Sequence, residues 1–176
     1  IGAGLGEHLS YEILNDAQKE NYVLVDLREN MTTAIKNKYP SMKVYTADCQ
    51  QRLPFADSSF DRILAIHVLE HLTDLPSCVQ EMHRICNKEN GVFSVVIPTE
   101  GSLAYSLARK ISAERVFVKT YKQSYKWFYQ REHINRPQEI IEELSPYFTL
   151  QKRAYFPLNI PFLFCNLCIG MTCYPK

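Results

Sequence analysis

Short runs of apolar, often β-branched residues alternate with longer amphipathic stretches through the first 97 positions of the chain. The apolar runs are typical of buried strands, and they cover residues 22–26, 43–47, 60–66 and 91–97. The stretches between them carry apolar residues at helical spacing with charges on the opposite face, and they cover Glu7–Lys19, Glu29–Lys38 and Leu75–Cys86. Strands that alternate with helices in this order predict βαβ units and a parallel sheet.

A different pattern follows Pro98. Residues 99–137 are rich in Tyr, Lys and Arg, and Tyr121, Tyr125 and Tyr129 recur at four-residue steps. That spacing predicts one helical face, and we interpret residues from about 99 to 137 as an inserted cap. The cap is followed by a predicted short helix and two predicted closing strands, at residues 138–144, 148–156 and 162–174.

Composition narrows the class of protein. With 176 residues, 46% of them hydrophobic, the chain can form one core of ordinary size, so we expect a single domain over residues 1–176. Twenty basic residues stand against nineteen acidic ones, and a nucleic-acid partner is therefore not expected. The apolar run Ile160–Met171 contains Pro161 and Asn166 and falls short of the roughly 18–20 residues of a membrane span, so we expect no transmembrane segment.

The six cysteines are scattered among long apolar segments. This spacing differs from the dense frameworks of small disulfide-rich scaffolds, so we expect reduced thiols and a cytoplasmic protein. Cys165 and Cys168 have the CxxC spacing of redox and zinc sites, but no second pair or nearby histidine completes four ligands. We therefore predict no metal site and interpret both residues as buried strand cysteines.

The chain opens with a glycine-rich run, Ile1-Gly2-Ala3-Gly4-Leu5-Gly6-Glu7, ahead of the first amphipathic stretch. Glycines between a strand and a helix let the backbone approach a ligand closely. The dinucleotide motif GxGxxG would need its third glycine at position 7, which is Glu7 here. The spacing GxGxG therefore favours S-adenosylmethionine over NAD, although glycine triplets also form ordinary turns.

Two carboxylates follow predicted strands at positions that suit a nucleoside ligand. Asp26 ends one strand about twenty residues beyond Gly6, where a carboxylate can accept hydrogen bonds from both ribose hydroxyls. Asp48 and Cys49 follow the next strand. There the carboxylate can accept a bond from the adenine amine, and the next amide can donate to a ring nitrogen. The alternatives are a helix N-cap at Asp26 and a turn aspartate at Asp48.

Two strings of residues carry a specific resemblance to a known family. They are Asp48-x4-Leu53-Pro54-Phe55-x-Asp57-x-Ser59-Phe60-Asp61 and Val68-Leu69-Glu70-His71-Leu72-x-Asp74. With the glycine run, they resemble the class I S-adenosylmethionine-dependent methyltransferases of the Methyltransf_11 type, which act on small molecules. The resemblance runs from Ile1 to about Pro98 and is less clear through Tyr174.

The resemblance implies a doubly wound α/β fold with a seven-stranded, Rossmann-like sheet whose final strand is antiparallel. It implies S-adenosylmethionine as cofactor and S-adenosylhomocysteine as product. Carried over by position, it assigns Gly2, Gly4 and Gly6 to the methionine portion, Asp26 with Leu27 to the ribose, Asp48 and Cys49 to the adenine, and His67 to the sulfonium. The family's central first strand and its acid before the first glycine precede Ile1, so we expect residues upstream.

Methyl transfer from a sulfonium is an in-line displacement, so a general base helps only where the acceptor must lose a proton. His67 and His71 lie four residues apart just after a predicted strand, and an unperturbed histidine titrates near neutral pH. We predict His67 as the base and His133, in the cap, as the second candidate. For His71 and Glu70 the leading interpretation is a structural role below the site.

The string Ala65-Ile66-His67-Val68 differs from the Asp/Asn-Pro-Pro-Tyr string of amino-directed nucleic-acid methyltransferases. This difference argues against N-methylation of DNA adenine or cytosine. Because a large cap would enclose a molecule of modest size, we expect a small-molecule or a glycan- or lipid-linked acceptor, with O-methylation preferred. Basic residues interleaved with aromatic ones in the cap fit an anionic acceptor, namely Lys119, Lys122, Lys126, Arg131 and Arg136, beside Tyr121, Tyr125, Trp127 and Tyr129. The alternative is a solvated face over an aromatic core stripe.

Three interpretations stay open beside this one. The apolar run Phe156–Cys168 is explained as a closing strand, and a homodimer or membrane-surface contact is the alternative. A non-catalytic subunit that binds S-adenosylmethionine is a rival function, because cofactor residues can persist where the chemistry has gone. An NAD-dependent oxidoreductase is a further rival, which Glu7 in place of the third glycine disfavours.

Overall fold

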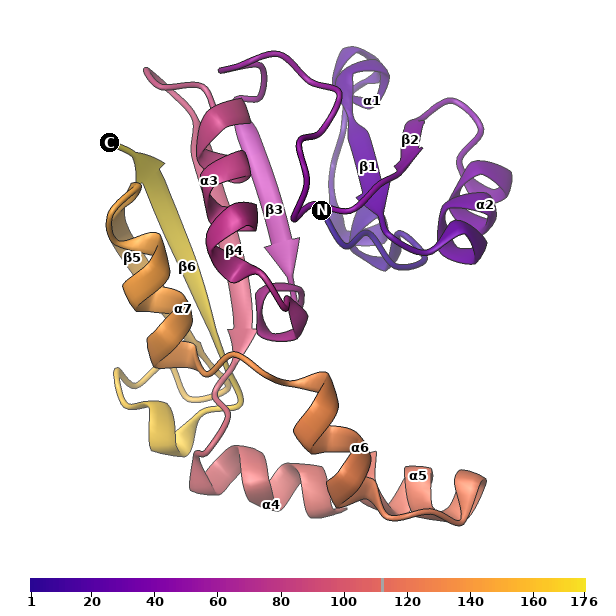
Figure 1. Cartoon of the computed structure of the whole chain (residues 1–176), viewed down its shortest axis with the longest axis vertical. Helices are drawn as coiled ribbons and strands as arrows, with labels where there is room; N and C mark the ends of the chain where they lie inside the picture. The colour runs from indigo at the N-terminus through magenta and orange to yellow at the C-terminus, as the bar shows by residue number, and fades with distance from the viewer. Residues whose placement is uncertain (112) are drawn as a thin grey trace.

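The structure, a computed structural model, describes residues 1–111 and 113–176, without the side chains of residues 103 and 127–130. Within these residues six strands form two sheets (Figure 1). The smaller sheet pairs β1 (Val23–Asp26) in parallel with β2 (Lys43–Thr46). The larger has the order β3-β4-β6-β5, with bounds Arg62–Ile66 for β3, Val92–Pro98 for β4, Cys168–Pro175 for β6 and Phe148–Phe156 for β5.

The directions of the strands confirm an α/β sheet with an antiparallel end. β3 pairs with β4 in parallel, whereas β6 pairs antiparallel with both β4 and β5. Residues 1–3 run between the two sheets, because the Ile1 amine donates to the Leu64 carbonyl at 2.8 Å and the Ala3 amide donates to the Val25 carbonyl at 3.0 Å. The described residues form six of the seven predicted strands, and the seventh stays a prediction.

The first predicted helix is wrong as a single element. Glu7–Lys19 divides into a 3-10 helix, η1 (Glu7–Tyr11), and a separate helix α1 (Asp16–Asn21). The cause is Asn15, whose side chain accepts from the Gln18 amide at 2.8 Å while the Gln18 side chain accepts from the Asn15 amide at 3.0 Å. This capping box starts a new helix instead of continuing the old one.

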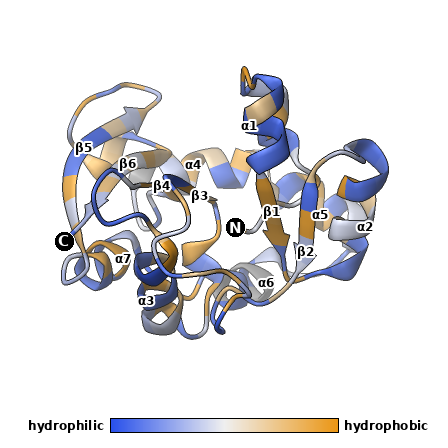
Figure 2. Cartoon of the chain, turned by 90° about the horizontal axis from the view of Figure 1, so that it is seen from above, coloured by the Kyte–Doolittle hydropathy of each residue, from blue (hydrophilic) through white to orange (hydrophobic). Residues whose placement is uncertain are grey.

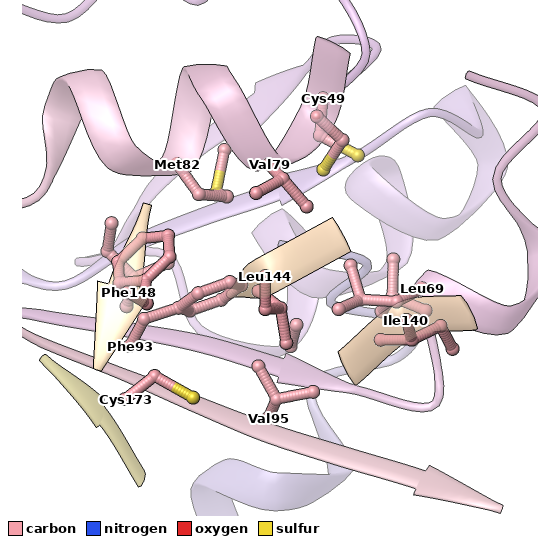
Figure 3. Close-up of a cluster of buried hydrophobic side chains, with 14 of the residues drawn as sticks. Cys49, Leu69, Val79, Met82, Phe93, Val95, Ile140, Leu144, Phe148 and Cys173 are labelled. Carbon is pink, nitrogen blue, oxygen red and sulfur yellow. The ribbon is translucent and has the colours of Figure 1, made fainter. Parts of the chain in front are cut away.

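The other helices predicted outside the cap are confirmed, as α2 (Glu29–Lys38), α3 (Leu75–Ile85) and α7 (Pro137–Leu144). α3 and α7 lie on one face of the larger sheet (Figure 1). Between them, Met82 and Val79 of α3 meet Leu144 of α7 and Phe93 of β4 in the main core (Figure 3). Figure 2 shows β1 in the hydrophobic colour and most of α1 beside it in the hydrophilic one.

The described residues of the cap form the helices α4 (Leu103–Ile111), α5 (Ala113–Tyr121) and α6 (Tyr125–Glu132). The single helical face predicted for Tyr121, Tyr125 and Tyr129 is wrong, because Tyr121 ends one helix and Tyr125 begins the next. Lys122 between them has a left-handed φ of 53°, which ends α5. Both rings nevertheless contact Phe117, with centroid distances of 4.8 and 5.2 Å. The side chain of Tyr129 lies outside the described residues.

The last predicted strand is too long at its start. Residues 162–174 were expected to be extended, but Leu163–Cys165 form a 3-10 turn, η3, and β6 begins at Cys168. The buried side chain of Asn166 is the cause, because it binds three backbone groups of the preceding loop. None of the helices formed by residues 1–111 and 113–176 is long and apolar enough to cross a membrane.

Candidate functional site

The glycine run forms a tight loop against the carboxyl ends of the strands. Gly2 and Gly4 have left-handed φ values of 60° and 56°, which side chains rarely adopt. A Cβ on Gly2 would lie 2.3 Å from Cγ2 of Val68, the residue after His67. Gly2 is therefore required by both its backbone conformation and the space around it. Because it has no side chain, the loop can lie against Val68, in the segment that follows β3.

The carboxylate of Asp26 fixes the same loop from the other side. Asp26 is buried at the end of β1. Its Oδ2 accepts from the Gly4 amide at 2.8 Å, and its Oδ1 accepts from the Arg28 amide at 2.9 Å. The alternative for this residue was a helix N-cap, but the N-cap of α2 is Arg28, and the second bond goes to the amide of that residue. Oδ1 also pairs with Arg28 Nε at 3.5 Å, whereas Oδ2 keeps a second lone pair with which Asp26 can accept from a ligand hydroxyl.

Asp48 and Cys49 follow β2 beside the end of β1. The Ala47 amide donates to the Asp26 carbonyl at 3.0 Å, which places the turn after β2 next to Asp26. Asp48 Oδ1 accepts from the backbone amide of Gln50 at 2.9 Å, as in a turn aspartate. Cys49 is buried against Cys78 of α3, and the hydrogen bond between the two thiols lowers the pKa of Cys49 and raises that of Cys78.

His67 comes directly after β3 and is half exposed. Its backbone has a left-handed φ of 54°, and its Nδ1 lies 3.2 Å from Oε1 of Glu70. Glu70 is buried, and its Oε2 has no hydrogen-bond partner among the described residues. His71 Nε2 lies 3.8 Å from the same Glu70 Oε1. One buried carboxylate therefore faces both histidines of the motif.

The second predicted base, His133, joins this group from the cap. Its ring contacts that of His71 edge to face, with centroids 4.7 Å apart, and its Nδ1 pairs with the carboxylate of Glu100. The pKa of His133 is lowered to about 4, mainly by burial and also by the nearby His71 and His67 rings, while the Glu70 carboxylate opposes the shift. His133 is thus neutral at physiological pH and a weak base, and Glu100 occupies its Nδ1.

The segment after His133 fixes the end of the cap on the same motif. The amides of Ile134 and Asn135 donate to the Glu70 carbonyl at 2.9 and 3.1 Å. The Asn135 side chain donates to the carbonyls of Leu69 and Leu72 at 2.8 and 2.6 Å. The cap is therefore joined to the turn that carries His67, although the two are more than sixty residues apart in the sequence.

The string that begins at Leu53 has a structural role in this fold. Glu81 of α3 accepts from the Leu53 amide at 2.8 Å and from Arg84 Nη2 at 2.6 Å. Arg84 Nη1 in turn pairs with Asp57 Oδ1 at 2.5 Å and donates to the Phe55 carbonyl at 2.9 Å. Two charged side chains of one helix thus fix the long turn between β2 and β3, and with it Asp48.

Exposed apolar side chains border the site. Leu27 follows Asp26 and is exposed, as are Leu5 in the glycine loop and Ile66 at the end of β3. Such side chains are a suitable platform for the flat face of a purine. They fit a nucleoside-bearing ligand such as S-adenosylmethionine, together with the close backbone approach at Gly2 and the buried Glu70 Oε2, which has no hydrogen-bond partner among the described residues.

The structure brings the predicted residues together and adds two that sequence reasoning missed. Gly2, Gly4, Asp26, Asp48 and His67 converge at the carboxyl ends of β1, β2 and β3. Glu70 was interpreted as structural, yet its side chain contacts His67. Glu100 was not singled out, and its only signal was a position just beyond β4.

The basic residues predicted to line the cap are all exposed, namely Lys119, Lys122, Lys126, Arg131 and Arg136. Tyr121 is also exposed. Trp127, predicted to lie among them, has a side chain outside the described residues. All six cysteines are free thiols, and the described residues hold no group of His, Cys, Asp and Glu arranged to bind a metal ion.

Solved structures resemble this chain along nearly its full length. A methyltransferase from Thermotoga maritima that depends on S-adenosylmethionine aligns with a TM-score of 0.69, covering 100% of this chain and 80% of that one at 17% identity. The N-methyltransferase NodS of Bradyrhizobium japonicum, solved with S-adenosyl-L-homocysteine, aligns with a TM-score of 0.55, covering 88% and 66% at 13% identity. At these identities the likeness shows the fold.

Sequence comparison reaches the family itself. A probable S-adenosylmethionine-dependent methyltransferase of Mycobacterium tuberculosis is 28% identical over 98 residues, which are 56% of this chain and 35% of the relative. The matched region thus spans about a third of that relative's length. The model of the methyltransferase domain family matches residues 1–95, more than half of the chain, and includes every predicted cofactor-binding residue. The protein therefore belongs to the methyltransferase domain family, whose cofactor is S-adenosylmethionine.

Proposed function

We propose that this protein transfers a methyl group from S-adenosylmethionine to an oxygen atom of a small-molecule or a glycan- or lipid-linked acceptor. The observation that carries the proposal is the half-exposed His67 after β3, held by the buried Glu70 and followed by Val68, which lies against Gly2. The match of the family to residues 1–95 supports the cofactor.

Different residues at the strand ends bind different parts of the cofactor in this proposal. In this proposal Gly2, Gly4 and Gly6 border the methionine portion, where backbone without side chains leaves room. Asp26 accepts from the ribose hydroxyls with its remaining lone pairs, and Leu27 packs beside it. Asp48 and the backbone amide of Cys49 bind the adenine edge. Bound there, S-adenosylmethionine supplies an electrophilic methyl group.

His67 and Glu70 then provide the proton acceptor. In this assignment the neutral ring of His67 donates its Nδ1–H to Oε1 of Glu70, 3.2 Å away, so that Nε2 is the nitrogen without a proton. Nε2 would take the proton of the acceptor hydroxyl as that oxygen gains the methyl group, and the sulfur–methyl bond would break to release S-adenosylhomocysteine. Glu70 is a positioning residue, since its carboxylate fixes the tautomer and orientation of the ring and stabilises the imidazolium.

The cap favours an acceptor that is small and negatively charged. It follows β4 and reaches the turn of His67 through Asn135, so an acceptor would bind between the cap and the strand ends. Exposed cations of the cap, including Lys119 and Lys122, suit carboxylate or phosphate groups on such a molecule. His133, with its pKa near 4, is the weaker candidate for the base.

Removal of the Asp26 carboxylate tests the cofactor site. We expect Asp26→Ala to weaken binding of S-adenosylmethionine at least tenfold, because charge-assisted hydrogen bonds to the ribose are lost. Calorimetric titration measures this, and Asp16→Ala, at an exposed carboxylate on α1, is the matched control. Wild-type affinity in Asp26→Ala, or a wild-type protein that binds NAD but not S-adenosylmethionine, would contradict the proposal.

Substitution of His67 tests the base. Because His67 has a left-handed φ, His67→Asn suits the backbone better than His67→Ala. Once radiolabelled S-adenosylmethionine and a metabolite extract have identified the acceptor, we expect His67→Asn to lower kcat by about 100-fold or more. His83→Asn, on α3, is the control. Full turnover in His67→Asn rules out His67 as base, and cofactor binding without any labelled product favours the non-catalytic alternative.

A further inference from the structure

In the loop between β5 and β6 the polar side chain of Asn166 is buried, while large apolar side chains lie on the surface. Asn166 is fully buried. Its Oδ1 accepts from the Leu158 amide at 3.0 Å, and its Nδ2 donates to the carbonyls of Ile160 and Phe162 at 2.9 and 2.8 Å. These bonds fix the backbone of the loop and leave its large side chains on the surface.

Five large apolar side chains within nine residues of this loop are 41–62% exposed: Phe156, Leu158, Ile160, Phe162 and Phe164. Single exposed apolar residues are normal, but a contiguous group is typical of an interaction surface. Phe162 and Phe164 also contact each other, with ring centroids 5.7 Å apart. We call residues 156–164 the apolar loop.

The apolar loop is continuous with the first two helices of the cap. The Ser102 hydroxyl, just before α4, donates to the Asn166 carbonyl at 3.2 Å, and the Thr99 amide donates to the Leu167 carbonyl at 3.0 Å. Both helices expose apolar residues, namely Leu107 and Ile111 of α4 and Val116, Val118 and Tyr121 of α5. Figure 1 shows η3 and α4 side by side, with α5 at the same end of the molecule.

Positive charge accompanies this apolar surface. Residues 103–126 contain six basic residues and one acidic residue, whereas the whole chain has twenty basic and nineteen acidic residues. Lys110, Arg115 and Lys119 line a shallow depression of about 490 Å³ between α4 and α5, together with Glu114 and Val118. The three cations form no ion pair with any residue that the structure describes. We call the apolar loop, α4 and α5 together the docking face.

We propose that the docking face binds the surface of an anionic lipid bilayer. Exposed Phe, Leu and Ile side chains insert at the boundary between headgroups and acyl chains, and neighbouring Lys and Arg side chains pair with lipid phosphates. A second copy of the chain fits less well, because a twofold contact through this face would bring two clusters of positive charge together. The proposal does not depend on methyl transfer.

Binding in this orientation would turn the site toward the bilayer. α4 follows the carboxyl end of β4, and the parallel strands β1 and β3 end at the same edge, where the glycine loop and His67 lie (Figure 1). The docking face and the candidate site therefore share one end of the molecule.

Sedimentation with vesicles tests the proposal. The purified full chain is mixed with vesicles of phosphatidylcholine alone or of phosphatidylcholine mixed with phosphatidylglycerol, and the bound fraction is measured against lipid concentration. We expect binding only to the anionic vesicles, and weaker binding as salt is added. Phe162→Ser with Phe164→Ser should weaken it at least tenfold. Arg115→Gln with Lys119→Gln should weaken it roughly 30-fold.

Matched controls separate this surface from unspecific adhesion. Ile13→Ser removes a side chain that is 99% exposed outside the docking face, and Lys36→Gln with Lys38→Gln removes two exposed cations of α2. Both should bind vesicles like the wild type, and thermal unfolding of all variants should be unchanged.

Equal binding to neutral vesicles, or undiminished binding of the Phe162→Ser, Phe164→Ser variant, overturns the proposal. So does a protein that ignores vesicles but forms dimers, seen by light scattering, that this variant abolishes.

Discussion

Two amphipathic helices of nearly equal length, α7 and α4, lie in opposite environments. In α7 the apolar residues Ile140 and Leu144 are 0% and 2% exposed, because they pack with α3 over the larger sheet. In α4 Leu107 and Ile111 are 61% and 55% exposed, although they too lie four residues apart on one face. An amphipathic pattern thus predicts which face of a helix is apolar, but not what covers that face.

The same contrast divides the cap. At its end, Ile134 and Asn135 donate hydrogen bonds to the backbone carbonyls of Leu69, Glu70 and Leu72. In α5, by contrast, none of the described residues is buried. Stability should therefore be concentrated where α7 and the end of the cap meet the core. The region of α4 and α5 should open at low cost, as expected where few apolar contacts are buried.

The largest effect should come from the buried helix. We expect Leu144→Ala to lower the free energy of unfolding by about 3 kcal/mol, because it removes buried methyl groups and leaves a cavity beside Phe93. Urea denaturation monitored by circular dichroism measures the change. A loss below about 1 kcal/mol would mean that α7 is not part of the cooperative core.

A smaller effect should come from His133, at the junction of the two regions. Burial holds its pKa at about 4 in the folded protein against an ordinary 6.5, so the unfolded chain binds this proton more tightly. The contribution of the neutral ring is therefore present above pH 6.5 and lost as the pH falls toward 4. The Glu70 carboxylate opposes this shift and Glu100 pairs with the ring, but burial is the largest cause and lowers the pKa.

Replacement by a residue that does not titrate measures that contribution. Between pH 6.5 and 4 we expect the unfolding free energy of the wild type to fall by about 2 kcal/mol more than that of His133→Asn. Urea denaturation at a series of pH values provides the comparison, and Asn135→Ala, which loosens the same junction without removing an ionisable group, should keep the wild-type slope. If the unfolding free energy falls equally with pH in the wild type and in His133→Asn, the His133 ring is exposed to water in the folded protein and its pKa is not lowered.

The smallest effect should come from the exposed helix. We expect Leu107→Ala, chemically the same change as Leu144→Ala, to alter the unfolding free energy by no more than about 0.5 kcal/mol, because the side chain is already largely in water. The two variants measured side by side give the comparison directly. A loss near that of Leu144→Ala would show that the apolar face of α4 is covered.

The residues of the candidate site could largely be predicted from the sequence. Asp26 and Asp48 each end or follow a parallel strand, and the carboxyl ends of such strands meet at one edge, so their neighbourhood follows from order alone. The role of Glu70 could not be predicted, since a carboxylate beside two histidines can face either of them or neither. Only the 3-10 turn at Leu69–His71 directs its side chain to His67.

Two predicted elements failed because of one asparagine side chain each, whereas the predicted tyrosine face is interrupted by the left-handed backbone of Lys122. Asn15 starts α1 by capping it, and Asn166 shortens β6 by binding the loop before it. The capping box of Asn15 is local, but the bonds of Asn166 depend on the loop that folds around it. Local propensity therefore placed the elements but not their limits.

The sequence by itself determined the order of strands and helices, the family and the positions of Gly2, Asp26, Asp48 and His67, because these depend on spacing along the chain. The tertiary structure decided which apolar faces are buried, that His67 and His71 both face Glu70, and that the apolar loop is directed outward around Asn166. The reason is physical, since burial and hydrogen-bond pairing depend on partners brought from distant parts of the chain.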